Sequence, residues 1–358
     1  MKIGILTFHC AYNYGAVLQC YALQEYLKSR GHSVYVIDYR PKAITSVYDW
    51  FVKRRIIRKN FVKSIVEICL LWSRKKRNTG FQNFITSRLN LASIDSIMNN
   101  PYDLILVGSD QVWNYHLTDG FDNYYWGNFR HPEATKIATY GASMHDKWTQ
   151  EESLHILELQ KNFCMISVRE SSLAEKLKSL TGRKDIYRVV DPTLLLSGNA
   201  WQSLAEKPNV KHPYLLLFQV EGKNRKTEAI AKEMARRKSL KIVHLFTLAD
   251  WGTTSSVMST SPTQFLGLFL YADFVVCSSF HGTIFSLLFR KSFLSVRMGI
   301  GKDNRVASLL ESMGLSDHFV DTLPKEYDGS CQLDDVQLDS LRQDSSQYII
   351  KLEKMIKC

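Results

Sequence analysis

The sequence predicts an α/β protein made of two doubly wound, Rossmann-like domains that face a cleft. Short apolar strands alternate with helical patterns through most of the 358 residues, and this alternation is typical of parallel sheets. The pattern restarts after Lys207-Pro208-Asn209, a plausible linker. We therefore expect an N-terminal domain at residues 1–200 and a C-terminal domain at 201–358, and the length is sufficient for two hydrophobic cores.

The elements of the first domain follow from its apolar runs and from the residues that end them. A strand at 2–8 leads to a helix at 15–30, which Gly31 would close. Further strands are expected at 33–38, 103–107, 137–140, 164–168 and 187–190, and further helices at 150–162 and 170–180. Residues 45–90 interrupt the alternation and are mostly helical and basic, so we interpret them as an insertion.

The second domain repeats the same alternation. Strands are expected at 214–220, 241–245, 274–277 and 293–296, and helices at 197–205, 224–238, 262–271 and 304–313. Pro262 suits the first turn of its helix, and Gly314 would close the last one.

Composition excludes several classes of protein. No apolar run reaches the roughly 18 residues of a membrane span, and residues 1–6 read as a strand, not as a signal peptide. The seven cysteines form no Cys-x-x-Cys pair and no zinc-like spacing. We therefore expect a cytoplasmic protein without a metal site or a cofactor.

The net charge of +11, from 46 Lys and Arg against 35 Asp and Glu, favours anionic partners. Ten Lys and Arg lie between residues 53 and 77, with Trp50, Phe51, Phe61 and Trp72 around or between them. This mixture suits a helix on the anionic inner face of a membrane. A solvated basic face is an equally good interpretation, and no nucleic-acid-binding motif accompanies the charge.

Polar residues follow the predicted strands, where ligands bind in open parallel sheets. They are His9, Asn13, Tyr14 and Gly15; Ser109, Asp110 and Gln111; Ser143; Arg169; Asp191; Ser278, Ser279 and His281; and Arg297. The first of these turns leads into a helix whose free amides attract anions, but it has no dinucleotide or P-loop motif. Asn13 could equally be a simple helix cap, as could Asp110 and Asp191.

His281 lies in the turn Ser278-Ser279-Phe280-His281-Gly282-Thr283, between a buried strand and a helix. The first helical amides could hold a phosphate or a carboxylate, and the imidazole could donate a proton. A lone histidine is nevertheless more often a packing or capping residue. Arg169 alone could likewise form a surface ion pair with Glu170, which contributes little.

Taken together, the turns resemble the polysaccharide pyruvyl transferase family from residue 3 to about residue 315. The resemblance is carried by Thr7-Phe8-His9 with Asn13-Tyr14-Gly15-Ala16-Val17-Leu18-Gln19; Val107-Gly108-Ser109-Asp110-Gln111-Val112-Trp113-Asn114; Ser167-Val168-Arg169-Glu170; Asp191-Pro192-Thr193-Leu194-Leu195; and Ser279-Phe280-His281-Gly282-Thr283. It implies a fold similar to the GT-B glycosyltransferases and transfer of a pyruvyl group from phosphoenolpyruvate to a sugar, which forms a ketal.

The resemblance also implies roles for the residues in these turns. His281 would protonate the enol methylene of phosphoenolpyruvate. The donor would be bound by Arg169, Ser278, Ser279, Gly282, Thr283 and Arg297, and the acceptor side would hold His9, Asn13, Tyr14, Gly15, Ser109, Asp110, Gln111 and Ser143. The family's histidine often follows Arg-Leu, but Ser279-Phe280 stands here, so Arg297 or Arg305 would replace that arginine.

The sequence therefore indicates a pyruvyl transferase that acts on a capsular, cell-wall or exopolysaccharide repeat unit. If that unit is carried on a lipid diphosphate, the basic insertion would hold the enzyme at the membrane. One alternative is a GT-B glycosyltransferase, in which His281 and Arg169 grip the diphosphate of a nucleotide sugar. A second is an assembly factor that only binds an anionic glycan.

Overall fold

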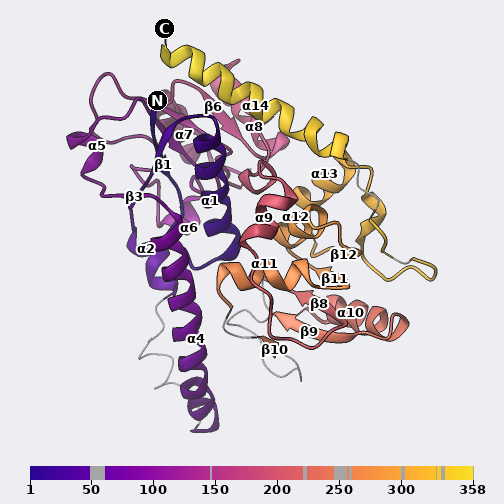
Figure 1. The fold of residues 1–358 in the computed structure, drawn as a ribbon. Helices are drawn as coiled ribbons and strands as arrows, with labels where there is room; N and C mark the ends of the chain where they lie inside the picture. Colours follow the sequence, from indigo (N-terminus) through magenta and orange to yellow (C-terminus); the bar gives the residue numbers. More distant parts are fainter. Residues whose placement is uncertain are drawn as a thin grey trace. The chain divides into compact units, whose positions relative to one another are not determined.

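A computed structural model of the chain describes residues 1–48, 61–145, 147–220, 224–245, 256–257, 260–299, 303–327, 329–331 and 335–357. It divides into two compact units (Figure 1). Unit 1 comprises Met1–Asp49, Asn83–Leu196 and Asp339–Cys358, and unit 2 comprises Trp50–Gln82 and Ser197–Leu338.

Unit 1 is a parallel sheet in the order β3-β2-β1-β4-β5. Its strands are β1 (Lys2–Leu6), β2 (Ser33–Ile37), β3 (Leu91–Ala92), β4 (Leu104–Val107) and β5 (Lys136–Thr139). Isolated parallel bridges, Ala138 to Met165 and Ala142 to Val168, continue the sheet to the parallel pair β6 (Ile166–Val168) and β7 (Ile186–Arg188). All four residues of β4 are buried, as expected for a strand covered on both faces.

The helices of unit 1 connect these strands. They are α1 (Tyr14–Ser29), α2 (Lys42–Thr45), α5 (Ser96–Asn99), α6 (Tyr115–Thr118), α7 (Gln150–Leu159), α8 (Ser171–Thr181) and the 3₁₀ turns η1 (Ser46–Tyr48), η2 (Gln160–Asn162) and η3 (Pro192–Leu194). Thr149 and Glu152 form a capping box at the start of α7, which satisfies two of its free amides.

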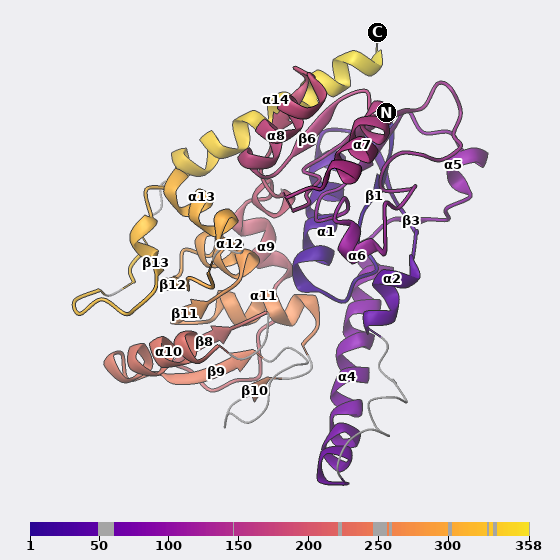
Figure 2. The same ribbon diagram turned by 180° about the vertical axis from the view of Figure 1, so that it is seen from behind.

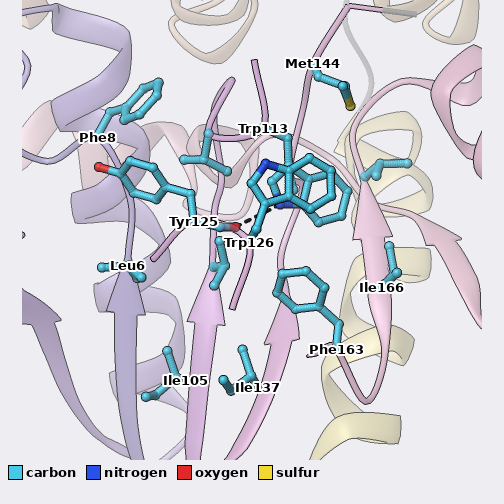
Figure 3. Close-up of a cluster of buried hydrophobic side chains, with 14 of the residues drawn as sticks. Leu6, Phe8, Ile105, Trp113, Tyr125, Trp126, Ile137, Met144, Phe163 and Ile166 are labelled. Carbon is cyan, nitrogen blue, oxygen red and sulfur yellow. Dashed lines mark hydrogen bonds between the residues drawn. The ribbon is translucent and has the colours of Figure 1, made fainter. Parts of the chain in front are cut away.

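The core of unit 1 is built around two stacked indoles (Figure 3). The rings of Trp113 and Trp126 lie 4.6 Å apart at 10°, and Trp113 Nε1 donates to the carbonyl oxygen of Tyr125 at 2.9 Å. Both tryptophans are at most 1% exposed. Because a buried indole is stable only when its N–H has a partner, this hydrogen bond fixes the segment that follows β4 against the sheet.

Unit 2 is a second parallel sheet, in the order β10-β9-β8-β11-β12-β13. Its strands are β8 (Tyr214–Phe218), β9 (Lys241–Leu245), β10 (Ser256–Val257), β11 (Phe274–Cys277), β12 (Phe293–Val296) and β13 (Phe319–Val320). Its helices are α9 (Gly198–Leu204), α10 (Arg225–Arg237), α11 (Pro262–Leu270), α12 (Phe280–Leu288), α13 (Asn304–Ser312) and the 3₁₀ turn η4 (Ser316–His318). β8 and β11 are buried throughout.

The two compact units differ from the expected domains in two segments. The last helix, α14 (Asp335–Lys357), runs beside α8 in Figures 1 and 2, and most of it belongs to unit 1. The hydroxyl of its buried Tyr348 donates to the Thr139 carbonyl oxygen at 2.6 Å. The boundary near residue 200 lies at 196/197, but the chain returns to unit 1, where Tyr348 of α14 contacts the carbonyl oxygens of Thr139 and Met165.

The second segment is the basic insertion, of which the structure describes α4 (Phe61–Arg88). Lys53, Arg54, Arg55, Arg58 and Lys59 lie outside the described residues, and Lys63 is described only in its backbone.

Within α4, two of the basic residues belong neither to a membrane-facing surface nor to a solvated one. Arg74 and Arg77 are 8% and 6% exposed, whereas Trp72 is 68% exposed. A Cβ at Gly80 on the same helix would lie 3.1 Å from Ser261 Cα, so this part of α4 packs closely against the start of α11. No helix within the described residues combines the length and the apolarity needed to cross a bilayer.

Candidate functional site

The strand order of each unit reverses at one point, and the candidate residues gather there. In unit 1 the chain leaves β1 for β2 on one side and reaches β4 on the other. In unit 2 the same reversal lies between β8 and β11. Ligands of doubly wound sheets bind beyond the carboxyl ends of the strands at such a switch point.

At the switch point of unit 1, the turns after β1 and β4 are tied together. The Thr7 hydroxyl donates to the Ser109 carbonyl oxygen at 2.8 Å, and Gln19 Nε2 donates to Thr7 Oγ1 at 3.0 Å. Gly108, with φ of +111°, is required, because a Cβ there would meet the Tyr140 carbonyl oxygen. Ser109 is fully buried, and its hydroxyl donates to the Gly141 carbonyl oxygen at 3.0 Å. Thr7 and Ser109 therefore hold the backbone in position.

Arg169 lies at the centre of a buried charge cluster in unit 1. Its Nη1 donates to Asp191 Oδ2 at 2.7 Å, Nη2 lies 3.6 Å from Asp110 Oδ1, and Nε lies 3.8 Å from Glu170 Oε1. The Arg169 side chain is 3% exposed and that of Asp191 is 0%. The interpretation of Arg169 as part of a surface ion pair is therefore wrong, because its side chain is buried. A buried guanidinium is stable only with its carboxylate partners in place.

The cluster holds one guanidinium and three carboxylates, so it carries net negative charge. Burial by itself would lower the pKa of Arg169, but the charges of Glu170, Asp191 and Asp110 outweigh it and raise the pKa. The Asp110 and Glu170 side chains are 18% and 16% exposed. Ser143 donates its hydroxyl to Glu170 Oε1 at 2.9 Å. The Asp110 and Glu170 side chains are thus both partly exposed, but Glu170 Oε2 is itself buried.

Asp191 and Asp110 differ in their local roles. Asp191 caps η3, since its Oδ1 accepts from the amide of Thr193 at 3.0 Å. This cap was predicted from the sequence. Asp110 caps no helix, because Asn114 occupies the N-cap of α6. Asp110 instead has φ of +77°, an uncommon backbone conformation for a residue with a side chain, and its Oδ1 accepts from the amide of Gln111 at 2.8 Å.

The first turn holds a second, smaller charge pair. His9 is fully buried and its Nε2 donates to Asp38 Oδ1 at 2.8 Å, while Nδ1 lies 3.2 Å from the Thr7 carbonyl oxygen. The hydrogen bond from His9 holds the pKa of Asp38 at about 2, and Arg40 acts in the same direction.

The other residues of this turn cap α1. Asn13 Oδ1 accepts from the amides of Gly15 and Ala16 at 2.9 and 3.4 Å, and Tyr14 is 4% exposed. The simple cap that the sequence allowed for Asn13 is therefore present. Its carboxamide oxygen accepts from both of the amides that would otherwise attract an anion.

In unit 2, His281 lies at the switch point, in the first turn of α12. The Ser278 amide donates to the Phe218 carbonyl oxygen at 3.1 Å, which joins the turn after β11 to the end of β8. Ser279 is the N-cap, and its Oγ accepts from the Gly282 amide at 3.4 Å. The half-buried His281 ring lies edge-on to Phe280, with centroids 5.5 Å apart.

Packing explains the small residues beside His281. A Cβ on Gly282 would lie 3.0 Å from both Cys277 Cβ and Phe218 Cδ1, so glycine lets α12 approach β8 and β11 closely. Thr283 is fully buried, and its hydroxyl is 2.7 Å from Ser295 Oγ. Gly282 and Thr283 therefore fix the position of the turn, while Ser278 and His281 are half-buried and His281 Nε2 is itself a buried atom.

The two arginines that could replace the family's Arg-Leu arginine differ in position. The Arg305 guanidinium lies 5.2 Å from the ring centre of Phe280, the neighbour of His281. Arg297 lies over Phe319 at 4.1 Å, and its Nε is 3.6 Å from Asp321 Oδ2. Arg305 is therefore better placed than Arg297 for an anion at the His281 turn. Among the described residues, no group of His, Cys, Asp and Glu is arranged to hold a metal ion.

Comparison with known proteins identifies the family. The profile of the polysaccharide pyruvyl transferase family matches residues 13–298. The chain belongs to this family. The match includes Arg169, His281 and the turns that carry both, as the sequence motifs predicted. No curated protein matches the chain at a significant level.

Solved structures show the fold of this family member. The chain is similar to UDP-GlcNAc 2-epimerase from Neisseria meningitidis bound to UDP-GlcNAc, with a TM-score of 0.52 at 10% identity over 98% of this chain and 100% of that one. It also matches the Methanocaldococcus jannaschii UDP-GlcNAc 2-epimerase (TM-score 0.46, 8% identity, 96% and 92% covered) and the E. coli heptosyltransferase WaaC with ADP-2-deoxy-2-fluoro heptose (0.37, 10%, 98% and 99%). The Neisseria structure confirms the GT-B-like α/β class.

Two residues of the site were not among the predicted ones. Asp38 follows β2 directly, so the rule that selected the other turns would also have selected it. Glu170 was read only as a partner for Arg169, but it also accepts from Ser143, which follows a different strand. Sequence spacing gives no sign of that contact.

We expect Arg169→Met to destabilise unit 1 by about 3–5 kcal/mol, because it leaves the buried Asp191 carboxylate without its cation. Arg188→Met, which changes an exposed arginine on β7, is the matched control and should cost less than about 0.5 kcal/mol. Urea unfolding of both variants measures the difference. Equal stabilities would show that the cluster does not depend on Arg169.

The depressed pKa of Asp38 predicts a pH-dependent contribution to stability. A carboxyl whose pKa is lower in the folded state, here about 2 against 3.8, stabilises the fold above its unfolded pKa and loses this contribution as the pH falls. The stability difference between wild type and Asp38→Asn should shrink as the pH falls from about 4 towards 2. Urea unfolding across this range, with the exposed Asp344→Asn as control, measures it. A difference that persists unchanged at pH 3 and below would contradict the His9–Asp38 pairing.

Proposed function

We propose that the protein transfers the pyruvyl group of phosphoenolpyruvate to two hydroxyls of one sugar in a capsular, cell-wall or exopolysaccharide repeat unit, forming a cyclic ketal. The proposal rests on the position of His281, which lies in the first turn of α12 at the switch point of unit 2. It also rests on the family to which the chain belongs. A helix N-terminus favours an anionic ligand, and an imidazole beside it can act as an acid.

In the proposed reaction His281 gives a proton to the methylene carbon of phosphoenolpyruvate, and the adjacent carbon becomes oxocarbenium-like. The oxygen of one sugar hydroxyl attacks that carbon and loses its proton, which restores the imidazolium. Phosphate then leaves, and the oxygen of a second hydroxyl closes the ring. One of the two hydroxyl protons returns to His281 and replaces the proton now on the methyl group. The other leaves with hydrogen phosphate, so the reaction needs no oxidant.

The donor carries a phosphate and a carboxylate, and a guanidinium can bind either with two hydrogen bonds. Arg305 is proposed as one such ligand because it lies over Phe280. Donor binding by Arg169 remains a prediction. Its Nε and Nη2 are buried, so the geometry favours an indirect role in which Arg169 positions Asp110 and Glu170.

Of those two carboxylates, Asp110 suits the acceptor, because a partly exposed carboxylate accepts hydrogen bonds from sugar hydroxyls. In Glu170, Oε1 accepts from Ser143 and Oε2 is buried. We therefore propose unit 1 as the acceptor side, and Asp110 as the residue there that meets the sugar.

Peripheral contact with a membrane is a separate proposal, supported by exposed Trp72 at 68% and by exposed Lys75 and Lys76 on α4. A cation near an anionic leaflet contributes about 1 kcal/mol, which salt screens. The protein should co-sediment with phosphatidylserine vesicles at low salt but not at high salt, and Lys75→Glu with Lys76→Glu should weaken this binding. Absence of the wild-type protein from vesicle pellets at low salt would leave α4 as a solvated surface.

The role of His281 is tested by phosphate release from phosphoenolpyruvate with a panel of polysaccharide repeat-unit oligosaccharides. His281→Ala should lower turnover by a factor on the order of 10² or more, because the carbon acid loses its positioned proton donor. His155→Ala removes an exposed imidazole on α7 and should leave turnover unchanged. Circular dichroism checks that both variants fold.

Near-normal turnover of folded His281→Ala would remove His281 from the mechanism. Nucleotide diphosphate release from a nucleotide sugar, with phosphoenolpyruvate left intact, would instead support the GT-B glycosyltransferase alternative.

A further inference from the structure

Unit 1 contains a cavity that the proposed reaction does not use. It has a volume of about 290 Å³, and its lining includes Tyr124, Phe129, Asp95, Asn99 and Arg130, together with aliphatic side chains of residues 94–98. Small-molecule sites in proteins begin at roughly 300 Å³, so the cavity has the size for one small ligand or one unit of a larger ligand.

The cavity lies at the same edge of the sheet as the candidate site. Residues 94–99 follow the carboxyl end of β3, as Asp38 follows that of β2 and His9 follows that of β1. Because these three strands are parallel neighbours, the segments after them emerge at one edge. The cavity therefore lies at the carboxyl-terminal edge of the sheet, where ligands of parallel sheets bind.

A continuous row of aromatic rings joins the first turn to the cavity. The ring of Phe8 is 5.1 Å from that of Tyr125, which is 5.4 Å from Tyr39; Tyr39 is 4.4 Å from Tyr124, and Tyr124 stacks on Phe129 at 5.4 Å. Figure 3 shows Phe8 and Tyr125 side by side at the start of this row. The cavity and the turn after β1 therefore belong to one packed array.

The lining has the chemistry of a sugar site. Tyr124 and Phe129 are half-buried and Asp95, Asn99 and Arg130 are exposed. A sugar ring offers an apolar C–H face that packs on an aromatic ring, and hydroxyls around its rim that both donate and accept. With the residues that the structure describes, the side chains of Asn99 and Arg130 make no hydrogen bond, so their donors are available to a ligand.

We propose that this cavity binds one sugar residue of the glycan acceptor, distinct from the sugar that receives the pyruvyl group. The inference rests on the proposed function, because pyruvyl transfer to a polysaccharide supplies an acceptor with several sugars. An acceptor that is also bound through a remote sugar gains affinity, but the bond-forming step does not change. The cavity should therefore affect the acceptor KM and leave kcat unchanged.

The binding claim is tested without any donor. Saturation-transfer difference NMR on the full chain uses the methyl glycosides of glucose, galactose, mannose, N-acetylglucosamine and N-acetylmannosamine. At least one should receive saturation at its ring C–H protons, and Phe129→Ala should abolish the signal. Arg130→Ala should reduce it at least twofold. Trp148→Ala is the matched control, because Trp148 is also a half-buried aromatic residue packed on the unit 1 core, and it should keep the signal.

Several results would overturn the proposal. One is a lack of saturation transfer to all five glycosides, and another is transfer that Phe129→Ala leaves unchanged while its circular dichroism spectrum stays native. Preferential saturation of the uracil protons of UDP-N-acetylglucosamine at this cavity would also overturn it, since the occupant would then be a base.

Turnover assays separate this proposal from the function on which it rests. If phosphoenolpyruvate is consumed with an acceptor, Phe129→Ala should raise the acceptor KM about tenfold and change kcat less than twofold. An unchanged KM would reject the cavity and leave pyruvyl transfer standing. Sugar binding at the cavity in a protein that never consumes phosphoenolpyruvate would reject pyruvyl transfer and leave the sugar site standing.

Discussion

The parallel pairing of β1 with β4, and of β8 with β11, is the constraint on which the first turn, the Asp110 turn and the His281 turn depend. Each pair marks the point where the strand order of its sheet reverses, which is where doubly wound sheets bind their ligands. The Thr7–Ser109 and Ser278–Phe218 hydrogen bonds close these pairs at their carboxyl ends. Gly108 lets its turn approach the Tyr140 carbonyl oxygen, and Gly282 lets α12 approach Cys277 and Phe218.

The two switch points carry opposite electrostatics. In unit 1 a single buried guanidinium, Arg169, is surrounded by three carboxylates, an environment that repels an anionic donor and attracts hydroxyls. In unit 2 an imidazole lies at a helix N-terminus, with the Arg305 guanidinium over its neighbour Phe280, an environment that attracts anions. This division supports an uncharged sugar acceptor on unit 1 and an anionic donor on unit 2.

Much of the fold was predictable, because buried parallel strands appear in the sequence as short apolar runs and most helices begin at capping residues or end at glycine. Strands β4 and β11 lie where the sequence placed them, but α12 begins at Phe280, so His281 lies in its first turn and not in the loop before it. The association of α14 with unit 1 was not predictable, since the partner of Tyr348 is the Thr139 carbonyl more than 200 residues away. The burial of Arg74 and Arg77 was missed for a similar reason, because charge composition does not reveal which face of a helix another element covers.

The site was predictable in its turns but not in its contacts. The rule for strand ends selected Arg169, Asp110 and Asp191, yet their convergence on one guanidinium depends on the order of β4, β5 and β6 in the sheet. The cavity beside Tyr124 and Phe129 was missed because its lining comes from two segments, one around α5 and one after α6, that carry no motif.

The most direct measurement of the central claim is the fate of phosphoenolpyruvate in D₂O with a polysaccharide repeat-unit acceptor, followed by NMR and mass spectrometry. If a solvent-exchangeable acid such as His281 protonates the methylene carbon, the ketal methyl group will carry one deuterium, and one phosphate will be released for each ketal. Intact phosphoenolpyruvate beside a glycosylated acceptor and a released nucleotide diphosphate would contradict pyruvyl transfer.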